Sequence, residues 1–409
     1  MDDYTTIFQK TYNGKRLSAN NHCNKVIYIV SNSADHPRYS PNPDSIISQA
    51  GVHRSAYIFN IIVKHFVKSN IYRLSFASQD TMSRTTEYPN ESYDNVTEVH
   101  LGQTGLGLFR HISSTLFAIV WFMKHLGDED IVVIYNFTPP IAVFVWFTML
   151  FRKYKLIVEF EELYGLIGTS RYKKLFLISE NYGIQKGTGF IVCSEKIAKH
   201  IRSSRSQTPP IAVSSGYFGS LTHPTTQLRN GTRLNVLYSG TLDDRRGVTR
   251  LIDTMVGLED IANLIITGTG PLKDYVANKA QLRENIRYLG VLPENMYQQI
   301  LAEADICINP TPPNTAFSQY SFPSKITYYL SHSKIVVSTR LDVIQTSPYR
   351  DMIIYYDDAK PENLRETLIY IRDHFESLSE RSKIFLKEIS VIQMREKNEI
   401  YHLFKSVCN

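Results

Sequence analysis

NVLYSGTLDDRRG, residues 235–247, is the stretch that decides the fold of this 409-residue chain. An apolar strand at 235–239 ends in Gly240 and turns through a polar loop toward a helix. Such a turn exposes backbone N–H groups that can hold an anion, and Arg245 and Arg246 add positive charge in the planar geometry that suits phosphate. The alternative is a solvated turn whose arginines point into water. The stretch predicts a phosphate-binding strand, loop and helix.

Strand-like runs separated by helix-length segments continue in both directions from this stretch. The runs lie at 25–31, 72–77, 131–136, 156–160, 190–193, 211–214, 235–239, 263–267, 286–289, 305–309, 335–338 and 352–356. This alternation predicts βαβ units and parallel sheets covered on both faces. Amphipathic stretches at 55–68 and 111–125 are expected connecting helices, and 362–409 is also expected to be helical.

A segment rich in Ser, Thr, Pro and Gly at 203–232 marks a domain boundary. The chain is also longer than one hydrophobic core usually supports. We therefore expect a first Rossmann-like domain over 1–215, a linker over 216–232 and a second domain over 233–385. A C-terminal helix over 386–409 is expected to pack back on the first domain.

Two further features of the second half suit an anion. Gly268 and Gly270 directly follow a strand, but the third glycine of the dinucleotide fingerprint is missing, which disfavours a dehydrogenase site. The tightness of the turn alone could explain both glycines. Pro323 and Ser324 mark a helix start with Lys325 in its first turn. A lysine there opposes the helix dipole, which favours a negatively charged ligand over a plain cap.

In this order, the features resemble the donor-binding domain of GT-B glycosyltransferases, specifically the retaining family 4. The resemblance covers 234 to about 366. Its motifs are YSG (238–240), RG (246–247), GTGP (268–271), RYLGV (287–291), ADICINP (304–310), SFPSK (321–325) and KIVVST (334–339). The first half matches more loosely, through LIVEFEELY (156–164) and GTGFIVCSE (187–195). The resemblance implies an α/β fold of GT-B architecture, with two doubly wound Rossmann-like domains facing across a cleft: acceptor domain first, donor domain second.

The resemblance also implies residue roles. Arg246 would hold the donor diphosphate, backbone groups near Val291 would face the base, and amides at the start of the helix at 323–330 would bind the distal phosphate and sugar. The expected donor-binding residues are Gly240, Arg245, Arg246, Gly268, Gly270, Val291, Tyr320, Ser324, Lys325 and Tyr328.

The chain departs from the family at two positions. Family members commonly carry two glutamates eight residues apart, the first near the transferred sugar and the second at the donor ribose. Tyr320 and Tyr328 stand at these positions. A phenol can hydrogen-bond to a hydroxyl but carries no charge at neutral pH. A glycine-rich acceptor loop is not evident either, since PNP (41–43) and GVHR (51–54) occupy its region.

Candidate catalytic and acceptor residues lie in the first half. Glu161 and Glu162 follow an apolar strand, where carboxylates could face an acceptor hydroxyl or a developing positive charge. Solvated loop carboxylates are the alternative. His53 and Arg54 could point into the cleft or form a surface pair. We expect Glu161, Glu162 and His53 to be catalytic, and His53 and Arg54 to bind the acceptor.

The predicted function is transfer of a sugar from a nucleotide-diphosphate sugar to a hydroxyl of a glycan or lipid-linked acceptor. The resemblance implies retention, no metal or other cofactor, and a setting in bacterial surface-polysaccharide biosynthesis. The alternatives are a sugar-nucleotide epimerase or phosphorylase on the same fold, and a catalytically silent glycan-binding or partner protein.

Composition and charge indicate which partners and which cellular location to expect. The formal charge of +6 suits a phosphate ligand, and no basic patch with interleaved aromatics predicts a nucleic-acid partner. Widely spaced cysteines and an N-terminus without a signal-peptide core predict a cytoplasmic protein. The longest apolar run, 141–151, is too short to span a bilayer and is expected to be a buried helix. Its aromatic residues and the following Arg152, Lys153 and Lys155 leave peripheral contact with the inner face of the plasma membrane as the alternative.

Overall fold

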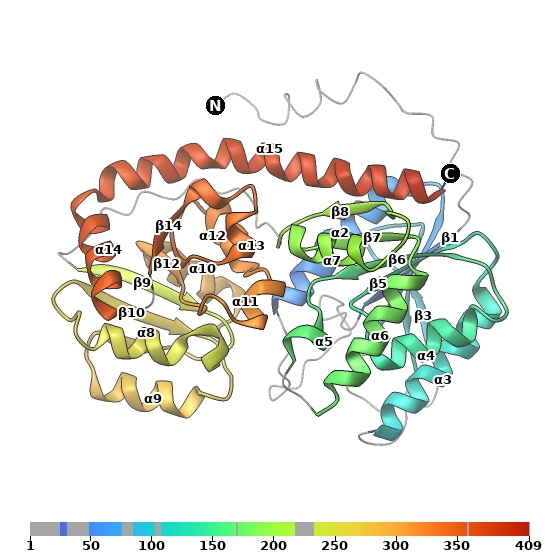
Figure 1. Ribbon diagram of the computed structural model, residues 1–409, viewed down its shortest axis with the longest axis horizontal. Coiled ribbons are helices and arrows are strands. Elements are labelled where there is room, and N and C mark those ends of the chain that lie inside the picture. The colour runs from blue at the N-terminus through green and yellow to red at the C-terminus, as the bar shows by residue number, and fades with distance from the viewer. Residues whose placement is uncertain are drawn as a thin grey trace.

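The structure is a computed structural model that describes residues 25–30, 49–75, 85–102, 108–168, 171–216, 233–357 and 360–408. Within these ranges the chain forms two sheets, each at the centre of one domain, and a long C-terminal helix crosses both domains (Figure 1). The predicted α/β class with two doubly wound domains is confirmed. The linker predicted at 216–232 lies almost entirely outside the described residues.

The first sheet has eight strands in the order β3-β4-β2-β1-β5-β6-β7-β8. Their bounds are β1 Lys25–Val30, β2 Asn70–Ser75, β3 Thr86–Pro89, β4 Val96–His100, β5 Ile131–Tyr135, β6 Lys155–Phe160, β7 Gly189–Val192 and β8 Ile211–Val213. Neighbouring strands are parallel except β3 and β4, which pair antiparallel at the edge. This hairpin was not predicted, because Thr97, Glu98 and His100 interrupt the apolar run that marks a buried parallel strand.

The second sheet is parallel and has six strands in the order β11-β10-β9-β12-β13-β14. Their bounds are β9 Leu234–Ser239, β10 Ala262–Thr267, β11 Ile286–Tyr288, β12 Ile306–Asn309, β13 Ile335–Thr339 and β14 Ile353–Tyr356. The order reverses between β9 and β12. In open parallel sheets, ligands bind at such a reversal, beyond the carboxyl ends of the strands. The stretch at 235–247 leads straight from β9 into this position.

Helices cover both faces of each sheet. In the first domain they are α2 Gln49–His65, α3 Leu108–His125, α4 Pro139–Thr148, α5 Tyr164–Ile167, α6 Lys173–Lys186 and α7 Glu195–Ser203. In the second domain they are η1 Asp244–Arg246, α8 Val248–Met255, α9 Lys273–Leu282, α10 Glu294–Glu303, α11 Ala316–Tyr320, α12 Lys325–Ser331, α13 Asp342–Gln345, η2 Arg350–Met352 and α14 Pro361–Asp373. The last helix is α15 Phe375–Cys408.

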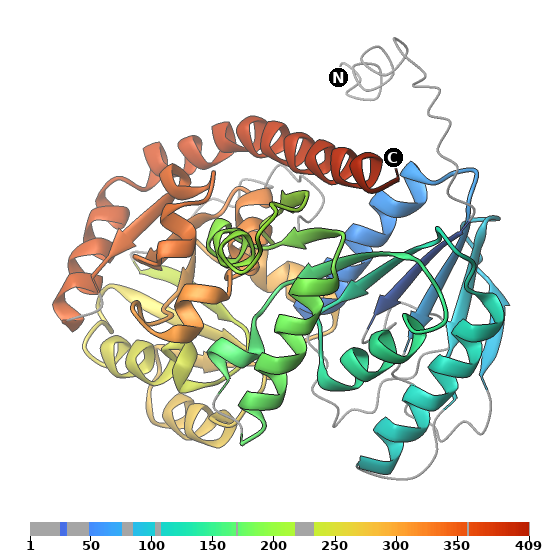
Figure 2. The same ribbon diagram turned by 45° about the vertical axis from the view of Figure 1, so that its right-hand side comes forward.

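The long helix α15 joins the two domains. Its first half lies against α12 and β13, and its second half lies against α2, β7 and β8 (Figure 2). Leu403 and Val407 pack over Gly189, where an added Cβ would lie 2.8 Å from the Leu403 side chain. Lys155 also donates a hydrogen bond to the Cys408 carbonyl at 2.9 Å. The helix is continuous from Phe375, so residue 385 falls inside it.

The apolar run predicted as a buried helix forms α4, which starts at Pro139 and Pro140. Phe144 and Val145 on one side of α4 are fully buried, whereas Trp146 on the other side is 53% exposed. The expected buried face is therefore present, and Trp146 lies on the opposite, exposed side of the helix. Among the described residues, no helix combines the length and apolar character that crossing a bilayer requires.

Candidate active site

Two loops meet backbone to backbone beyond β9 and β10. Gly268 has a φ of +125°, and an added Cβ there would lie 1.9 Å from the Gly240 carbonyl oxygen. An added Cβ at Gly270 would lie 2.5 Å from the Leu242 carbonyl oxygen. The Gly-x-Gly pair therefore has a packing reason: only glycine lets the second loop close on the first.

The loop after β9 ends in a tight turn that sets the start of α8. Asp243 accepts a hydrogen bond from the Arg245 backbone N–H at 2.7 Å and so caps η1. Gly247 follows with a φ of +74°, and an added Cβ would lie 1.9 Å from the Pro310 carbonyl oxygen. The loop is thus pressed against the end of β12, at the reversal of strand order.

Two of the predicted donor residues form a pair of neighbouring cations at this point. Lys325 donates a hydrogen bond to the Ser239 hydroxyl at the end of β9, and its ammonium lies 5.2 Å from the Tyr297 ring centre. The Arg246 guanidinium lies 4.9 Å from the Phe317 ring centre. Burial, followed by the charge of Arg246, lowers the pKa of Lys325 to about 8. A bound anion would relieve this repulsion.

Arg245 is arranged differently from Arg246. Its side chain is half exposed and pairs with Asp243 at 2.7 Å. Its guanidinium lies 5.6 Å from the Phe317 ring centre, so both arginines border the same ring. Of the two arginines, it is the charge of Arg246 that contributes to lowering the pKa of Lys325.

The other predicted donor residues surround the two loops. Val291 follows Gly290 in the loop after β11, and its side chain is 64% exposed, which is unusual for valine. Ser324 lies directly before α12 and is partly exposed; its carbonyl accepts a hydrogen bond from Thr327 at 2.8 Å.

The two tyrosines at the family's glutamate positions lie in different surroundings. Tyr328 is only 6% exposed. Its hydroxyl donates to the Glu294 carboxylate at 3.2 Å and accepts from the Gln298 amide at 2.5 Å. Tyr320 faces the first domain, where the Lys196 ammonium lies 5.4 Å from its ring centre. A carboxylate therefore lies beside Tyr328, where the family commonly has its second glutamate, but this carboxylate belongs to Glu294 of α10.

Glu162 contacts the second domain directly. Its carboxylate accepts a hydrogen bond from the Ser321 hydroxyl at 3.1 Å. Ser321 belongs to the SFPSK stretch that leads into α12, and the short helix α5 after Glu162 packs on α11. Glu162 thus lies at the junction between the end of β6 and the predicted donor loop.

Arg54, which we expected to bind the acceptor, is buried within a network of polar contacts in the first domain. It is 1% exposed and donates to Glu159 at 2.9 Å, to the Ser214 hydroxyl at 2.9 Å and to the Gly216 carbonyl at 2.7 Å. Glu161 approaches its Nε at 2.8 Å as an ion pair. The physical reason is charge: the fully buried carboxylate of Glu159 and the partly buried carboxylate of Glu161 need a cation beside them. His53, the preceding residue, is partly exposed in α2.

Sequence reasoning missed two buried glutamates, Glu159, which pairs with Arg54, and Glu396, which shares the partner Ser214 with Arg54. Glu159, inside β6, also accepts from the Tyr28 hydroxyl at 3.1 Å. Burial raises the pKa of Glu159, and the Glu161 charge adds to this against the opposing effect of Arg54. Glu396 of α15 accepts from the Ser214 hydroxyl at 2.9 Å and from the Tyr349 hydroxyl at 2.7 Å. Glu396 therefore ties α15 to both domains.

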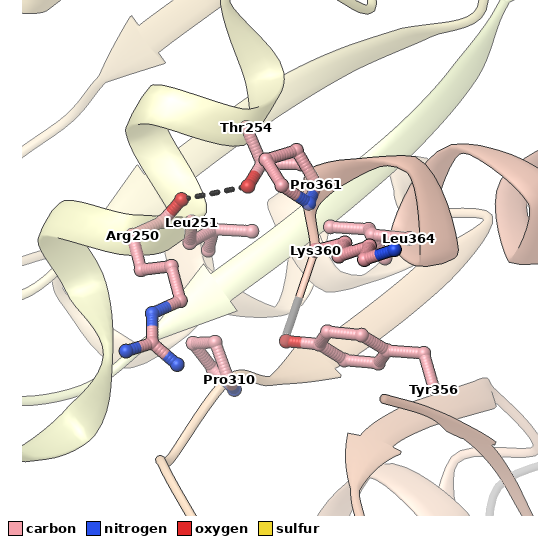
Figure 3. Close-up of a pocket in the computed structure, with 8 residues that line it drawn as sticks. All are labelled: Arg250, Leu251, Thr254, Pro310, Tyr356, Lys360, Pro361 and Leu364. Atoms are coloured by element: carbon pink, nitrogen blue, oxygen red, sulfur yellow. Dashed lines mark hydrogen bonds between the residues drawn. The ribbon is translucent and has the colours of Figure 1, made fainter. Parts of the chain in front are cut away.

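A hollow of about 300 Å³ lies elsewhere in the second domain (Figure 3). It is lined by residues of α8, by the start of α14 with the residue before it, by Pro310 just after β12 and by Tyr356 at the end of β14. The Arg250 side chain reaches toward Pro310 (Figure 3). No predicted donor residue lines it. In the described part of the chain, no cluster of three or more His, Cys, Asp or Glu side chains could hold a metal ion.

Comparison with known proteins finds similarity only in structure. No protein-family model matches the sequence, and no curated protein matches it. Among solved structures, sucrose-phosphate synthase from Thermosynechococcus elongatus aligns with a TM-score of 0.68 at 12% identity, over 93% of this chain and 99% of that one. HepE from Anabaena, in complex with UDP and glucose, aligns with a TM-score of 0.64 at 12% identity, over 93% and 99% of the two chains. The chain adopts the GT-B fold.

A third GT-B structure widens the comparison. WaaG, described as a glycosyltransferase involved in lipopolysaccharide biosynthesis, aligns with a TM-score of 0.60 at 12% identity, over 88% of this chain and 95% of that one. These alignments run through both domains of the GT-B fold, so the pairing of the two sheets is shared as well as each sheet alone. At these identities the likeness establishes the fold alone.

Proposed function

We propose that this chain is a glycosyltransferase that moves a sugar from a nucleotide-diphosphate sugar to a hydroxyl of a glycan or lipid-linked acceptor. The observation that carries the proposal is the pair Arg246 and Lys325 at the reversal of strand order. Two neighbouring cations, one with a lowered pKa, are an arrangement suited to a diphosphate. HepE, a neighbour in fold, binds UDP and glucose, which supports the same class of donor.

The mechanism follows from where the charges lie. Arg246 and Lys325 would neutralise the negative charge that builds on the departing diphosphate. Val291 would contact the base, and Glu294 beside Tyr328 would accept hydrogen bonds from donor hydroxyls. Glu162 lies opposite, at the junction of the domains, where its carboxylate can orient or deprotonate an acceptor hydroxyl. Glu161 and Arg54 would fix the backbone that presents Glu162.

Retention of anomeric configuration and independence from metal belong to the proposal. The two cations can supply the charge neutralisation that a divalent ion provides elsewhere. A chelator such as EDTA should leave turnover unchanged. Loss of activity in EDTA, with recovery on adding Mg²⁺ or Mn²⁺, would remove this part of the proposal.

The direct test is turnover by the purified full chain. Candidate nucleotide-diphosphate sugars are incubated with lipid-linked and soluble glycan acceptors, and the released nucleoside diphosphate is measured. We expect release to depend on the acceptor and the product to keep the anomeric configuration of the donor. The setting we propose is cytoplasmic assembly of a surface polysaccharide.

A catalytically silent binding protein is the second candidate, because tyrosines occupy both of the family's glutamate positions. Such a protein would bind a nucleotide or glycan without releasing product from any donor tried. Release of product from even one donor, lost in Glu162→Gln, would exclude it.

A further inference from the structure

Exposed apolar side chains gather on one face of the first domain. The helices α3, α4 and α6 lie side by side there, and α15 covers a different face (Figures 1 and 2). Of the 19 large hydrophobic side chains exposed in the described residues, eleven lie on these helices or at their ends. The α3–α4–α6 face is defined by Leu116 and Val120 of α3, Val143 and Trp146 of α4, and Leu175 and Ile178 of α6.

Folding of the domain does not require these outward side chains. The inward sides of α3 and α4 already fill the core, with Phe122 and Phe144 fully buried and their rings 4.5 Å apart. In α4 the one polar side chain, Thr148, is itself buried and bonds back to the Phe144 carbonyl. Exposed apolar side chains gathered on adjoining helices in this way are typical of an interaction site.

The charged side chains on and around the α3–α4–α6 face indicate which class of partner this face binds. Among the residues that form α3, α4 and α6, the one acidic side chain is Glu180, which is buried and accepts a hydrogen bond from the Gly165 N–H at 3.0 Å. Three exposed basic residues, Arg171, Lys173 and Lys174, precede or begin α6.

More charges lie where α3 and α4 end. Lys124 and Lys153 are exposed there, and the acidic Asp128 and Glu129 lie in the turn beyond α3. A second copy of this chain would bring the same basic residues to the contact. An apolar surface with a basic border instead matches anionic headgroups above a hydrocarbon layer.

We propose that the α3–α4–α6 face docks on an anionic lipid bilayer. The helix α6 packs on α5, and α5 packs on α11 of the second domain. Docking would therefore hold the junction that contains Glu162 close to the lipid surface. The proposal goes beyond sugar transfer and does not depend on it, because binding is measured without donor or acceptor.

The test uses the full chain and vesicles of phosphatidylcholine with or without phosphatidylglycerol. We expect co-sedimentation with the anionic vesicles at low salt, little with neutral vesicles, and release at about 0.5 M salt, where headgroup attraction is screened. The chain has two tryptophans, and Trp121 is buried whereas Trp146 is exposed. Binding should therefore shift the Trp146 emission to the blue and protect it from acrylamide.

Matched variants locate the contact. Val143→Asp should abolish vesicle binding, whereas Val391→Asp, at a similarly exposed position of α15 (60% against 55%), should bind like the parent. Lys173→Ala combined with Lys174→Ala should weaken binding by roughly an order of magnitude. Circular dichroism confirms that each variant is folded.

Three results would overturn the proposal. The first is no sedimentation of the parent with anionic vesicles at low salt. The second is equal binding by the parent and a folded Val143→Asp variant. The third is self-association in light scattering that Val143→Asp abolishes, without any lipid binding, which would assign the face to a second copy.

Discussion

Tyr328 donates a hydrogen bond to the Glu294 carboxylate at 3.2 Å, although the two residues are 34 positions apart in the sequence. The Gln298 amide completes the group, 2.6 Å from the same carboxylate and 2.5 Å from the phenol oxygen. The negative charge that Tyr328 lacks is therefore present beside it, supplied by the first residue of α10. This arrangement gives the tyrosine at this position a defined partner.

The first prediction separates the two residues. Glu294→Gln should weaken donor binding by roughly ten- to a hundredfold, since hydrogen bonds to a charged group are worth about 1.5–3 kcal/mol. Tyr328→Phe should weaken it a few-fold, because its neutral bond is worth about 0.5–1.5 kcal/mol. Calorimetry with the nucleotide sugar that the parent turns over measures both. Glu303→Gln, an exposed glutamate at the end of the same helix, is the control.

A double variant sharpens this prediction. Tyr328→Glu alone places a second carboxylate against Glu294 and should lower stability and affinity through repulsion between like charges. Tyr328→Glu combined with Glu294→Gln moves the carboxylate to the other helix and should restore much of the binding. If Glu294→Gln binds donor as the parent does, the carboxylate has no part in the donor site.

The second prediction concerns Lys325, whose pKa is lowered to about 8 by burial and by Arg246. A diphosphate binds the protonated lysine, so affinity should fall as the pH rises above about 8, by up to about tenfold per pH unit. Titrations of a nucleoside diphosphate between about pH 6.5 and 9.5 test this. The fall in affinity with pH should vanish in Lys325→Met and persist in Lys360→Met. Lys360 is an exposed lysine that lines the hollow between α8 and α14. A parent profile that stays flat through pH 9 would contradict it.

The same shift has a consequence for stability. The folded pKa of Lys325 lies below its unfolded value of 10.5, so charging this lysine at neutral pH costs stability in the ligand-free protein. Lys325→Met should therefore raise the free energy of unfolding at pH 7, on the order of 2 kcal/mol. The same variant should lose the stabilisation that a nucleoside diphosphate gives the parent.

The third prediction concerns Glu396, whose pKa burial raises to about 7. The folded protein keeps this proton at a pH where the unfolded chain has released it. Its contribution to stability is thus fully present below about pH 4.5 and is lost as the pH rises through 7. Urea unfolding between about pH 4.5 and 7 should show a smaller fall in the free energy of unfolding for Glu396→Gln than for the parent. Glu388→Gln, exposed on the same helix, should follow the parent.

The fourth prediction concerns the junction of the domains. Glu162→Gln should lower kcat by about 10²–10⁴ if this carboxylate transfers a proton, with donor affinity unchanged. Ser321→Ala removes only the hydrogen-bonding partner at 3.1 Å and should reduce kcat much less. Steady-state rates and donor titrations measure both. A Glu162→Gln enzyme with the kcat of the parent would remove Glu162 from the mechanism.

Much of the fold could be predicted because its signals are local. Twelve apolar runs matched strands, since a buried parallel strand is apolar on both faces. Gly240 and Arg246 likewise marked the loop after β9 in the sequence, and Lys325 marked the start of α12. The edge hairpin of β3 and β4 carried polar residues and gave no such signal.

The residues that could not be predicted make contacts between distant parts of the chain. Ser214 and Glu396 are 182 positions apart, and Arg54 and Glu159 are 105 apart. A lone glutamate in a helical pattern looks like a solvated residue, and only the packing of α15 on both domains buries Glu396. The burial of Arg54 could not be predicted for the same reason, because its partners come from β6 and from the end of the first domain.

Calorimetric titration of UDP, GDP, ADP and CDP into the parent, Arg246→Ala and Arg250→Ala tests whether Arg246 holds a nucleotide diphosphate. Arg250 lies one turn beyond Arg246, lines the hollow between α8 and α14, and is the matched control. We expect the parent and Arg250→Ala to bind at least one nucleoside diphosphate equally, and Arg246→Ala to bind it roughly tenfold or more weakly. Equal binding by Arg246→Ala and the parent, or no binding of any of the four by the parent, would contradict the assignment of this site to a nucleotide diphosphate.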